Sequence, residues 1–240
     1  LILSEEQQFL KDTAKSFARD KTPTTHFRKL RDDENTKCWD DSIWQEMVQL
    51  GWSGILVPEE FGGSDFGIAG ISVIMQELGK TLTPSPILAT SVLGVSAINL
   101  LGSQEQKEKY LPKIVSGDVT TALAIDEGNH HSPLDIETTA ILKGDKWSLN
   151  GQKVFIIDGA SADYILIVAR TSGKKGESNG LSVFVSEKNS EGLEISKIST
   201  ADCRNYSNLK MNNLVLEGNA LLGEVDTAGE IIEKVLDLGR

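Results

Sequence analysis

Apolar residues recur at helical spacing through the first 118 residues and at every second position through most of the chain that follows. Two capping boxes, which begin at Ser4 and Ser103, mark helix starts. Residues 22–38 are polar and contain Pro23, so the pattern predicts a loop there. Helices are predicted from Ser4 past Phe17, from a cap at Asp41 or Ser42 to Gly51, and over 67–79, 85–101 and 104–115.

The predicted helix over 85–101 is apolar on nearly every side, a pattern that is typical of a helix buried all round. Gly102 ends this run, and the next capping box follows directly. The first 118 residues therefore predict an all-helical domain with this segment as its central helix.

From Val119 the alternation predicts short strands, separated by turn signals such as Gly144–Asp145 and Asn150–Gly151. Short strands at this spacing predict a small antiparallel β-barrel or sandwich. From Thr227 the spacing is helical again up to Arg240, which we interpret as the first helix of a truncated or missing C-terminal helical domain. The strands are predicted over 119–126, 137–143, 146–156, 163–171, 181–186, 192–198 and 207–216.

The predicted fold class is thus an α+β multidomain chain. An all-α domain over 1–118 precedes a small β domain over 119–226, and 227–240 begin a further helical domain.

The formal net charge of −11 over 240 residues disfavours nucleic acid and anionic lipid as partners. No apolar run approaches the ~18 residues of a membrane span, so no membrane insertion is expected. Cys38 and Cys203 lie far apart in the sequence and predict no disulfide framework, which fits a reducing, cytoplasmic location. His26, His130 and His131 lack metal-ligand spacing, and no metal site is predicted.

Short motifs follow one another in a characteristic order along the whole chain. They are Trp44 with Leu50-Gly51-Trp52 and Val57-Pro-Glu-Glu-Phe-Gly-Gly63, then Glu77-Leu-Gly-Lys80, Tyr110-Leu-Pro112 with Ser116-Gly117, Leu149-Asn-Gly-Gln-Lys153, Ala162-Asp163 and Leu221-Leu-Gly-Glu224. In this order and spacing they resemble the acyl-CoA dehydrogenase family.

The resemblance implies an enzyme that binds FAD and catalyses the α,β-dehydrogenation of an acyl-CoA thioester, with a role in fatty acid metabolism such as β-oxidation. It further implies an electron-transfer flavoprotein or similar acceptor, and a homo- or hetero-oligomer. In a eukaryote, the resemblance implies the mitochondrial matrix. Such chemistry requires polar donors that hold the flavin, an apolar wall that excludes water, and a carboxylate as general base.

The resemblance also implies positions for the cofactor and the substrate. Ser132 is expected near the pyrophosphate of the cofactor or near the acyl-CoA, and Arg204 is expected to contact the substrate. The flavin is expected to lie against Leu123, Ile125, Asp126, Phe155 and Ile157.

Several of these positions depart from the family pattern. Asp126 and Ile157 each replace a hydroxyl donor, and a carboxylate at Asp126 should disfavour the anionic reduced flavin. Asn129 and His131 replace glycines that allow close backbone approach. Phe155 replaces a tryptophan and keeps an apolar wall.

No catalytic base is predicted within this chain. Some family members carry a glutamate immediately before an arginine in the helix that follows the β domain, and here Gly239 precedes Arg240. Asp237 lies on another face of that helix and is a poor substitute. The base is therefore expected in the missing C-terminal region.

Other interpretations of the same residues stay open. The chain could be a non-catalytic subunit of a heteromeric acyl-CoA dehydrogenase, or a flavin-dependent monooxygenase on the same fold. Residues 122–132 could belong to a β domain that binds no flavin. His130 and His131 could contact a phosphate or be exposed loop residues, and Arg204 could be a surface arginine.

Overall fold

Helices form the first part of the chain in the computed structural model, which describes residues 3–33 and 37–240. The capping boxes at Ser4 and Ser103 both form, and each begins a helix as predicted. The helical elements are α1 (Glu5–Lys21), α2 (Thr24–Asp32), α3 (Asp41–Gln49), the 3₁₀ turn η1 (Glu59–Phe61), α4 (Ile68–Lys80), η2 (Ile87–Gly94), α5 (Val95–Leu101) and α6 (Gln104–Val115).

The helix α2 contradicts the loop that the sequence pattern predicts over 22–38. Among its nine residues only Phe27 and Leu30 are large and apolar, and only Leu30 is buried, so the helical period was too sparse to detect. Residues 34–36 of that predicted loop lie outside the described residues. The cap of α3 is also one residue earlier than predicted, because the Asp40 carboxylate accepts from the Ser42 amide at 2.8 Å.

The predicted central helix over 85–101 divides into a π-helical segment, η2, and an α-helical segment, α5. Thr90 in the wide turn accepts a hydrogen bond from the Thr121 amide at 3.0 Å and donates to the Thr121 carbonyl at 3.2 Å. Gly94 lies so close to this strand that a Cβ atom there would be 1.8 Å from the Thr121 hydroxyl. The segment is therefore fastened to the start of the sheet.

The β domain forms one eight-stranded sheet with the strand order β6-β7-β3-β2-β4-β5-β8, and β1 pairs with β4 beside that path. The predicted antiparallel arrangement is wrong for β1, which runs parallel to β4, and for the single β2–β4 pair. The strands are β1 (Thr121–Ala124), β2 (Thr139–Lys143), β3 (Lys146–Ile156), β4 (Tyr164–Arg170), β5 (Leu181–Glu187), β6 (Leu193–Lys197), β7 (Ser207–Glu217) and β8 (Leu221–Leu222).

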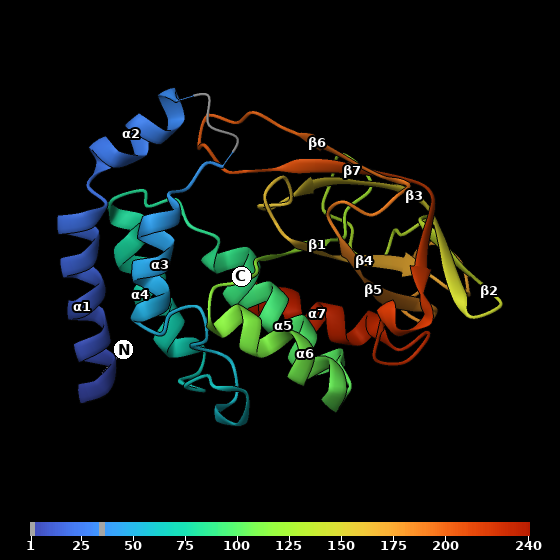
Figure 1. Cartoon of the computed structure of the whole chain (residues 1–240), viewed down its shortest axis with the longest axis horizontal. Helices are drawn as coiled ribbons and strands as arrows, with labels where there is room; N and C mark the ends of the chain where they lie inside the picture. The colour runs from blue at the N-terminus through green and yellow to red at the C-terminus, as the bar shows by residue number, and fades with distance from the viewer. Residues whose placement is uncertain (1–2, 34–36) are drawn as a thin grey trace.

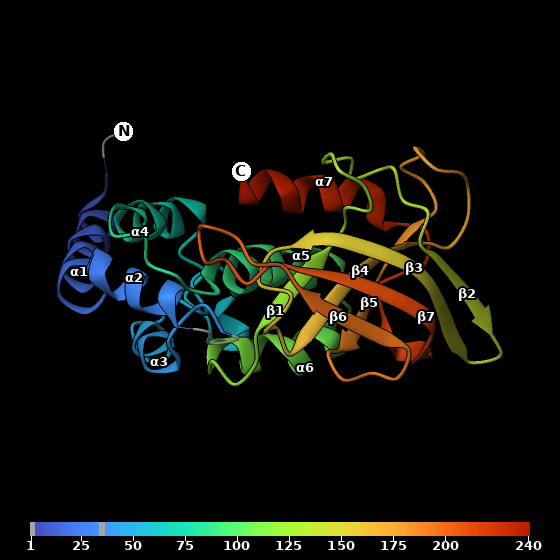
Figure 2. The same cartoon turned by 90° about the horizontal axis from the view of Figure 1, so that it is seen from above.

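One hydrophobic core lies within the sheet and another lies between the sheet and the helices. The rings of Trp147 on β3 and Phe184 on β5 meet edge to face at 5.1 Å inside the sheet. The helices α5, α6 and α7 (Ala228–Gly239) lie against the sheet, while α1 to α4 form the far end of the molecule (Figures 1 and 2). Among the described helices, none has both the length and the apolar character that a membrane crossing requires.

Candidate functional site

Two segments that are well separated in the sequence meet where β1 ends beside β3. The Val154 amide donates a hydrogen bond to the Asp126 carbonyl at 2.8 Å, and the Lys153 ammonium donates to the Ile125 carbonyl at 2.9 Å. This pairing brings the loop 126–132 next to Phe155. The sequence assigns both the loop and Phe155 to one site.

A buried ion pair holds the base of this loop. The ammonium of Lys153 is fully buried and lies 2.7 Å from the Glu127 carboxylate. That carboxylate also accepts the amide hydrogens of Glu137, at 2.7 Å, and Thr138, at 3.0 Å. Burial lowers the pKa of Lys153 to about 8 against the attraction of Glu127. For Glu127, burial opposes ionisation, but the Lys153 charge together with the hydrogen bonds from Lys153, Thr138 and Glu137 leaves the pKa of Glu127 below its usual value.

The carboxylate of Asp126 is bound within its own loop. One of its oxygens accepts the Ser132 amide hydrogen at 3.0 Å, and the other lies 2.9 Å from the His131 Nδ1 atom. The second ring nitrogen of His131 is 3.5 Å from the Arg240 guanidinium. His130 and His131 are exposed loop residues, yet His131 joins this loop to the end of α7.

Phe155 is displayed outward by a β-bulge in β3. Lys153 pairs with Leu209 and Ile156 pairs with Ser207, so β3 carries one extra residue relative to β7. Phe155 adopts a left-handed backbone with a φ of 53°, and the residue is 60% exposed. The ring meets Tyr206 edge to face at 5.8 Å.

The other apolar candidates offer less surface. Leu123 and Ile125 pack in the core between the sheet and the helices, and they are only 7% and 6% exposed. Ile157 is half-buried. The accessible apolar surface at this position therefore belongs mainly to Phe155.

Arg204 lies beside the buried carboxylate of Asp158, which belongs to the turn that follows Phe155. Its guanidinium is 3.7 Å from the Asp158 carboxylate, and the Asp158 side chain is 5% exposed. Neighbouring polar atoms of Asn205 and Ser207 are also buried, and they have no hydrogen-bond partner within the described part of the chain. Burial raises the pKa of Asp158 to about 6, although Arg204 acts in the opposite direction.

This buried carboxylate predicts a pH-dependent stability. An unfolded aspartate ionises near pH 4, so between about pH 4 and pH 6 only the folded state holds this proton. The contribution of Asp158 to the free energy of unfolding should therefore fall as the pH rises through that window. We expect Asp158→Asn to raise the free energy of unfolding by about 1–3 kcal/mol near pH 7, with little effect near pH 4.

Urea denaturation at the two pH values measures this difference. The matched control is Asp12→Asn, which changes an exposed aspartate on α1 and should show no such difference. An equal effect of Asp158→Asn at both pH values would contradict the prediction.

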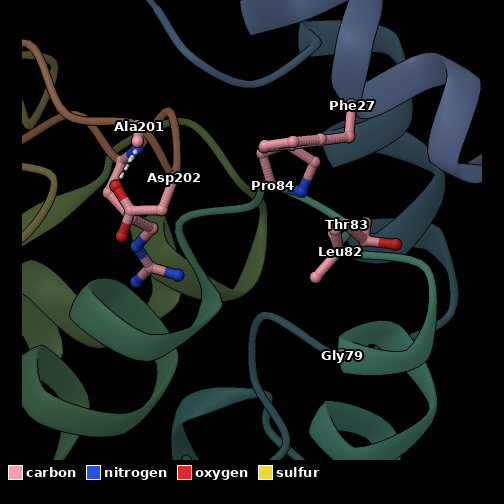
Figure 3. Close-up of a pocket in the computed structure, with 8 residues that line it drawn as sticks. Phe27, Gly79, Leu82, Thr83, Pro84, Ala201 and Asp202 are labelled. Carbon is pink, nitrogen blue, oxygen red and sulfur yellow. Dashed lines mark hydrogen bonds between the residues drawn. The ribbon is translucent and has the colours of Figure 1, made fainter.

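The cavities described lie beside these segments, and Phe155 lines none of them. A cavity of about 530 Å³ separates Phe27 and Pro84 from Ala201 and Asp202, and Arg204 also lines it (Figure 3). A smaller cavity of about 200 Å³ lies under the loop between Glu127 and Ser132. The sequence did not reveal the first cavity, because its walls come from segments that only the fold brings together.

A structural anchor that sequence reasoning missed is Arg170 at the end of β4. The residue is only 8% exposed, and its guanidinium donates solely to backbone carbonyl groups in the hydrogen bonds described. An isolated arginine in a strand pattern gave no signal of this role. The carbonyl groups belong to Ile136 at 3.0 Å, Ser172 at 3.3 Å, Asn179 at 3.0 Å, Leu134 at 3.2 Å and Glu177 at 3.0 Å.

Family models match nearly all of the chain. The model of the acyl-CoA dehydrogenase N-terminal domain matches residues 4–118, and that of the acyl-CoA dehydrogenase middle domain matches residues 122–217. The chain belongs to the acyl-CoA dehydrogenase family. The resemblance read from the motifs is thus confirmed, as is a helical N-terminal domain followed by a β domain and a final helix.

Individual relatives support the same assignment. The acryloyl-CoA reductase (NADH) of Anaerotignum propionicum is 33% identical over 82% of this chain and 50% of its own length. An acyl-CoA dehydrogenase of Bacillus subtilis is 30% identical over 81% of this chain and 51% of its own length. The structure of butyryl-CoA dehydrogenase from Megasphaera elsdenii matches with a TM-score of 0.87 at 25% identity, over 100% of this chain and 64% of that chain. The chain spans about half the length of the first two relatives.

Members of this family typically bind FAD, and the residues here fit the apolar part of that cofactor. The exposed Phe155 ring, flanked by half-buried Ile157, suits the face of a planar aromatic group. The polar residues fit FAD less well, because the Asp126 carboxylate offers no hydrogen-bond donor and already accepts the amide hydrogen of Ser132. The apolar residues therefore fit a flavin ring, and the Asp126 carboxylate competes for the donor that the FAD phosphates would need.

The end of α7 reaches the same loop through Arg240. At Gly239 an added Cβ atom would lie 2.7 Å from the tip of Leu93 on η2, so the position faces the helix that is fastened to β1. The Asp237 carboxylate is held by Arg240 at 2.6 Å. Neither position places a free carboxylate beside Phe155.

Proposed function

We propose that this chain is the FAD-binding part of an acyl-CoA dehydrogenase-type oxidoreductase, which acts on an acyl-CoA thioester and passes electrons to an electron-transfer flavoprotein or a similar acceptor. The observation that carries this proposal is the Phe155 ring, which a bulge displays next to the loop 126–132. Bound FAD would supply the hydride acceptor. Phe155 and Ile157 would exclude water from its ring, and Ser132 would face its phosphates or the acyl-CoA.

The general base is proposed to come from outside this chain. Gly239 has no side chain to serve, and Asp237 is paired with Arg240. The protein would then act as part of a larger homo- or hetero-oligomeric assembly in which another segment or subunit places a carboxylate at the α carbon. The printed names of the relatives, an acryloyl-CoA reductase and an acyl-CoA dehydrogenase, favour an acyl-CoA as the substrate class.

A second candidate function is a non-catalytic subunit of a heteromeric acyl-CoA dehydrogenase. It is favoured by the Asp126 carboxylate, which consumes the Ser132 amide that an anionic cofactor would otherwise use. In this case the chain would stabilise a catalytic partner and would not hold flavin of its own.

Flavin affinity separates the two functions. Asp126→Thr removes a negative charge and frees the Ser132 amide, and a hydrogen bond from such a donor to a charged group contributes about 1.5–3 kcal/mol. We therefore expect the variant to bind FAD roughly tenfold more tightly than the unaltered chain, or better. Titration of FAD with flavin fluorescence as the signal measures both dissociation constants.

The matched control is Asp135→Thr, which removes an exposed carboxylate from the same region and leaves the Ser132 amide bonded. It should change the affinity for FAD only slightly. If neither the unaltered chain nor Asp126→Thr takes up FAD, the enzyme proposal fails and the subunit function is favoured.

A further inference from the structure

The fold brings the two cysteines of the chain together, although they are far apart in sequence. Cys38 lies between α2 and α3, and Cys203 lies in the loop between β6 and β7, which reaches toward the end of α2 (Figures 1 and 2). Both residues are buried, at 6% and 7% exposure, and both are free thiols. They line the same cavity of about 400 Å³, which gives a small molecule access to both.

The two thiols also interact directly. Burial, and then the hydrogen bond and charge of Cys38, raise the pKa of Cys203 to about 12. The Cys203 thiol therefore keeps its proton near neutral pH, and Cys38 is its hydrogen-bond neighbour in the cavity that both residues line. The Arg31 side chain on α2 lines the same cavity as Cys203, which also places the two parts of the molecule close together.

The backbone at Cys203 fixes its position in this contact. The residue adopts a left-handed conformation with a φ of 52°, which is uncommon for a residue other than glycine. Its amide donates to the Thr200 carbonyl at 3.1 Å, which closes a tight turn. A strained conformation that the surrounding structure maintains often marks a functional position.

We propose that Cys38 and Cys203 form a reversible disulfide that ties the helical domain to the β6–β7 loop. The oxidant class is a low-molecular-weight disulfide such as glutathione disulfide. The Cys38 thiolate attacks one sulfur of this disulfide, forms a mixed disulfide and releases one reduced thiol. Cys203 then loses its proton and attacks the Cys38 sulfur, which releases the second reduced thiol. Two protein thiols are oxidised, and one small disulfide is reduced to two thiols.

The crosslink would act beside Arg204, which the family resemblance assigns to the substrate. Arg204 directly follows Cys203 and lines both the 400 Å³ cavity and the larger cavity of Figure 3. A covalent tie one residue away would hold Arg204 in place relative to Phe27 and Pro84. This proposal is independent of flavin binding, because neither cysteine belongs to the segments assigned to FAD.

The test exposes the folded chain to glutathione disulfide and follows the products by intact mass and peptide mapping. We expect a loss of two hydrogens and a peptide that joins Cys38 to Cys203. In Cys203→Ser the reaction should stop at a single glutathione adduct on Cys38, and in Cys38→Ser the remaining thiol should react more slowly. Reducing agent should reverse each product.

Three outcomes would overturn the proposal. The first is a glutathione adduct on each of the two cysteines of the unaltered chain, and the second is a disulfide between two chains. The third is a folded chain whose thiols both stay free under conditions in which the urea-unfolded chain reacts. A second measurement needs no variant: phenylarsine oxide bridges two neighbouring thiols, so it should protect both cysteines of the folded chain from alkylation in a one-to-one adduct. Failure of one-to-one protection would also count against the proposal.

Discussion

Lys153→Met is expected to lower the free energy of unfolding by about 3–5 kcal/mol, because it leaves the Glu127 carboxylate without its buried partner. The ammonium is fully buried, and it bonds both that carboxylate and the Ile125 carbonyl. Methionine fills a similar volume, so the loss would come from unpaired polar groups rather than from a cavity. Urea denaturation, with the midpoint and slope fitted together, measures the change.

The double variant Glu127→Gln/Lys153→Met should recover part of this loss. Glutamine removes the unpaired charge and can still accept the amide hydrogens of Glu137 and Thr138. The control is Lys175→Met, which breaks an exposed pair with Glu137 at 3.0 Å and should change the free energy of unfolding only slightly. Equal losses of the free energy of unfolding for Lys153→Met and Lys175→Met would show that the burial of Lys153 is unimportant.

Arg170→Met should have an effect of similar size, a loss of about 3–5 kcal/mol. The guanidinium donates hydrogen bonds to carbonyl groups from two loops, including those of Ile136 and Asn179. Because the position is buried, water cannot take over all of these hydrogen bonds when the guanidinium is removed. Arg170→Lys should recover little, because an ammonium has three donors and lacks the planar geometry. Urea denaturation gives the loss, and amide hydrogen exchange should show faster opening over 172–180.

Arg19→Met is the matched control for this prediction. Arg19 pairs with the adjacent Asp20 on the surface of α1, where both side chains are more than half exposed, so its removal should be nearly neutral. A stable Arg170→Met variant with unchanged exchange over 172–180 would contradict the anchoring role.

Local patterns predicted much of the fold. The capping boxes at Ser4 and Ser103 located helix starts because a cap is a contact between residues three positions apart. The helix α2 escaped detection because it buries only Leu30. The parallel pairing of β1 with β4 could not be predicted, since alternation within a strand carries no information on the direction of its partner.

The candidate site shows the same division. Motif order indicated the family and the importance of Asp126 and Phe155, and the family assignment is confirmed. The partners of Asp126 could not be predicted, because the contacts with His131 and the Ser132 amide depend on the conformation of the loop. The contact of His131 with Arg240 was also hidden, since Arg240 approaches from the end of the last helix. Arg170 and the two cysteines were missed for a related reason, since their roles depend on residues from other segments.

The bulge gives β3 one residue that the pairing of the sheet does not need. Three steps along β3, from Lys153 to Ile156, match two along β7, from Leu209 to Ser207. Deleting one residue at Val154 or Phe155 would restore a regular ladder that keeps Lys153 opposite Leu209 and Ile156 opposite Ser207, without changing which side chains face inward beyond that point. A single-codon deletion at this point should therefore leave the rest of the sheet paired and remove the left-handed backbone that Phe155 adopts in the bulge.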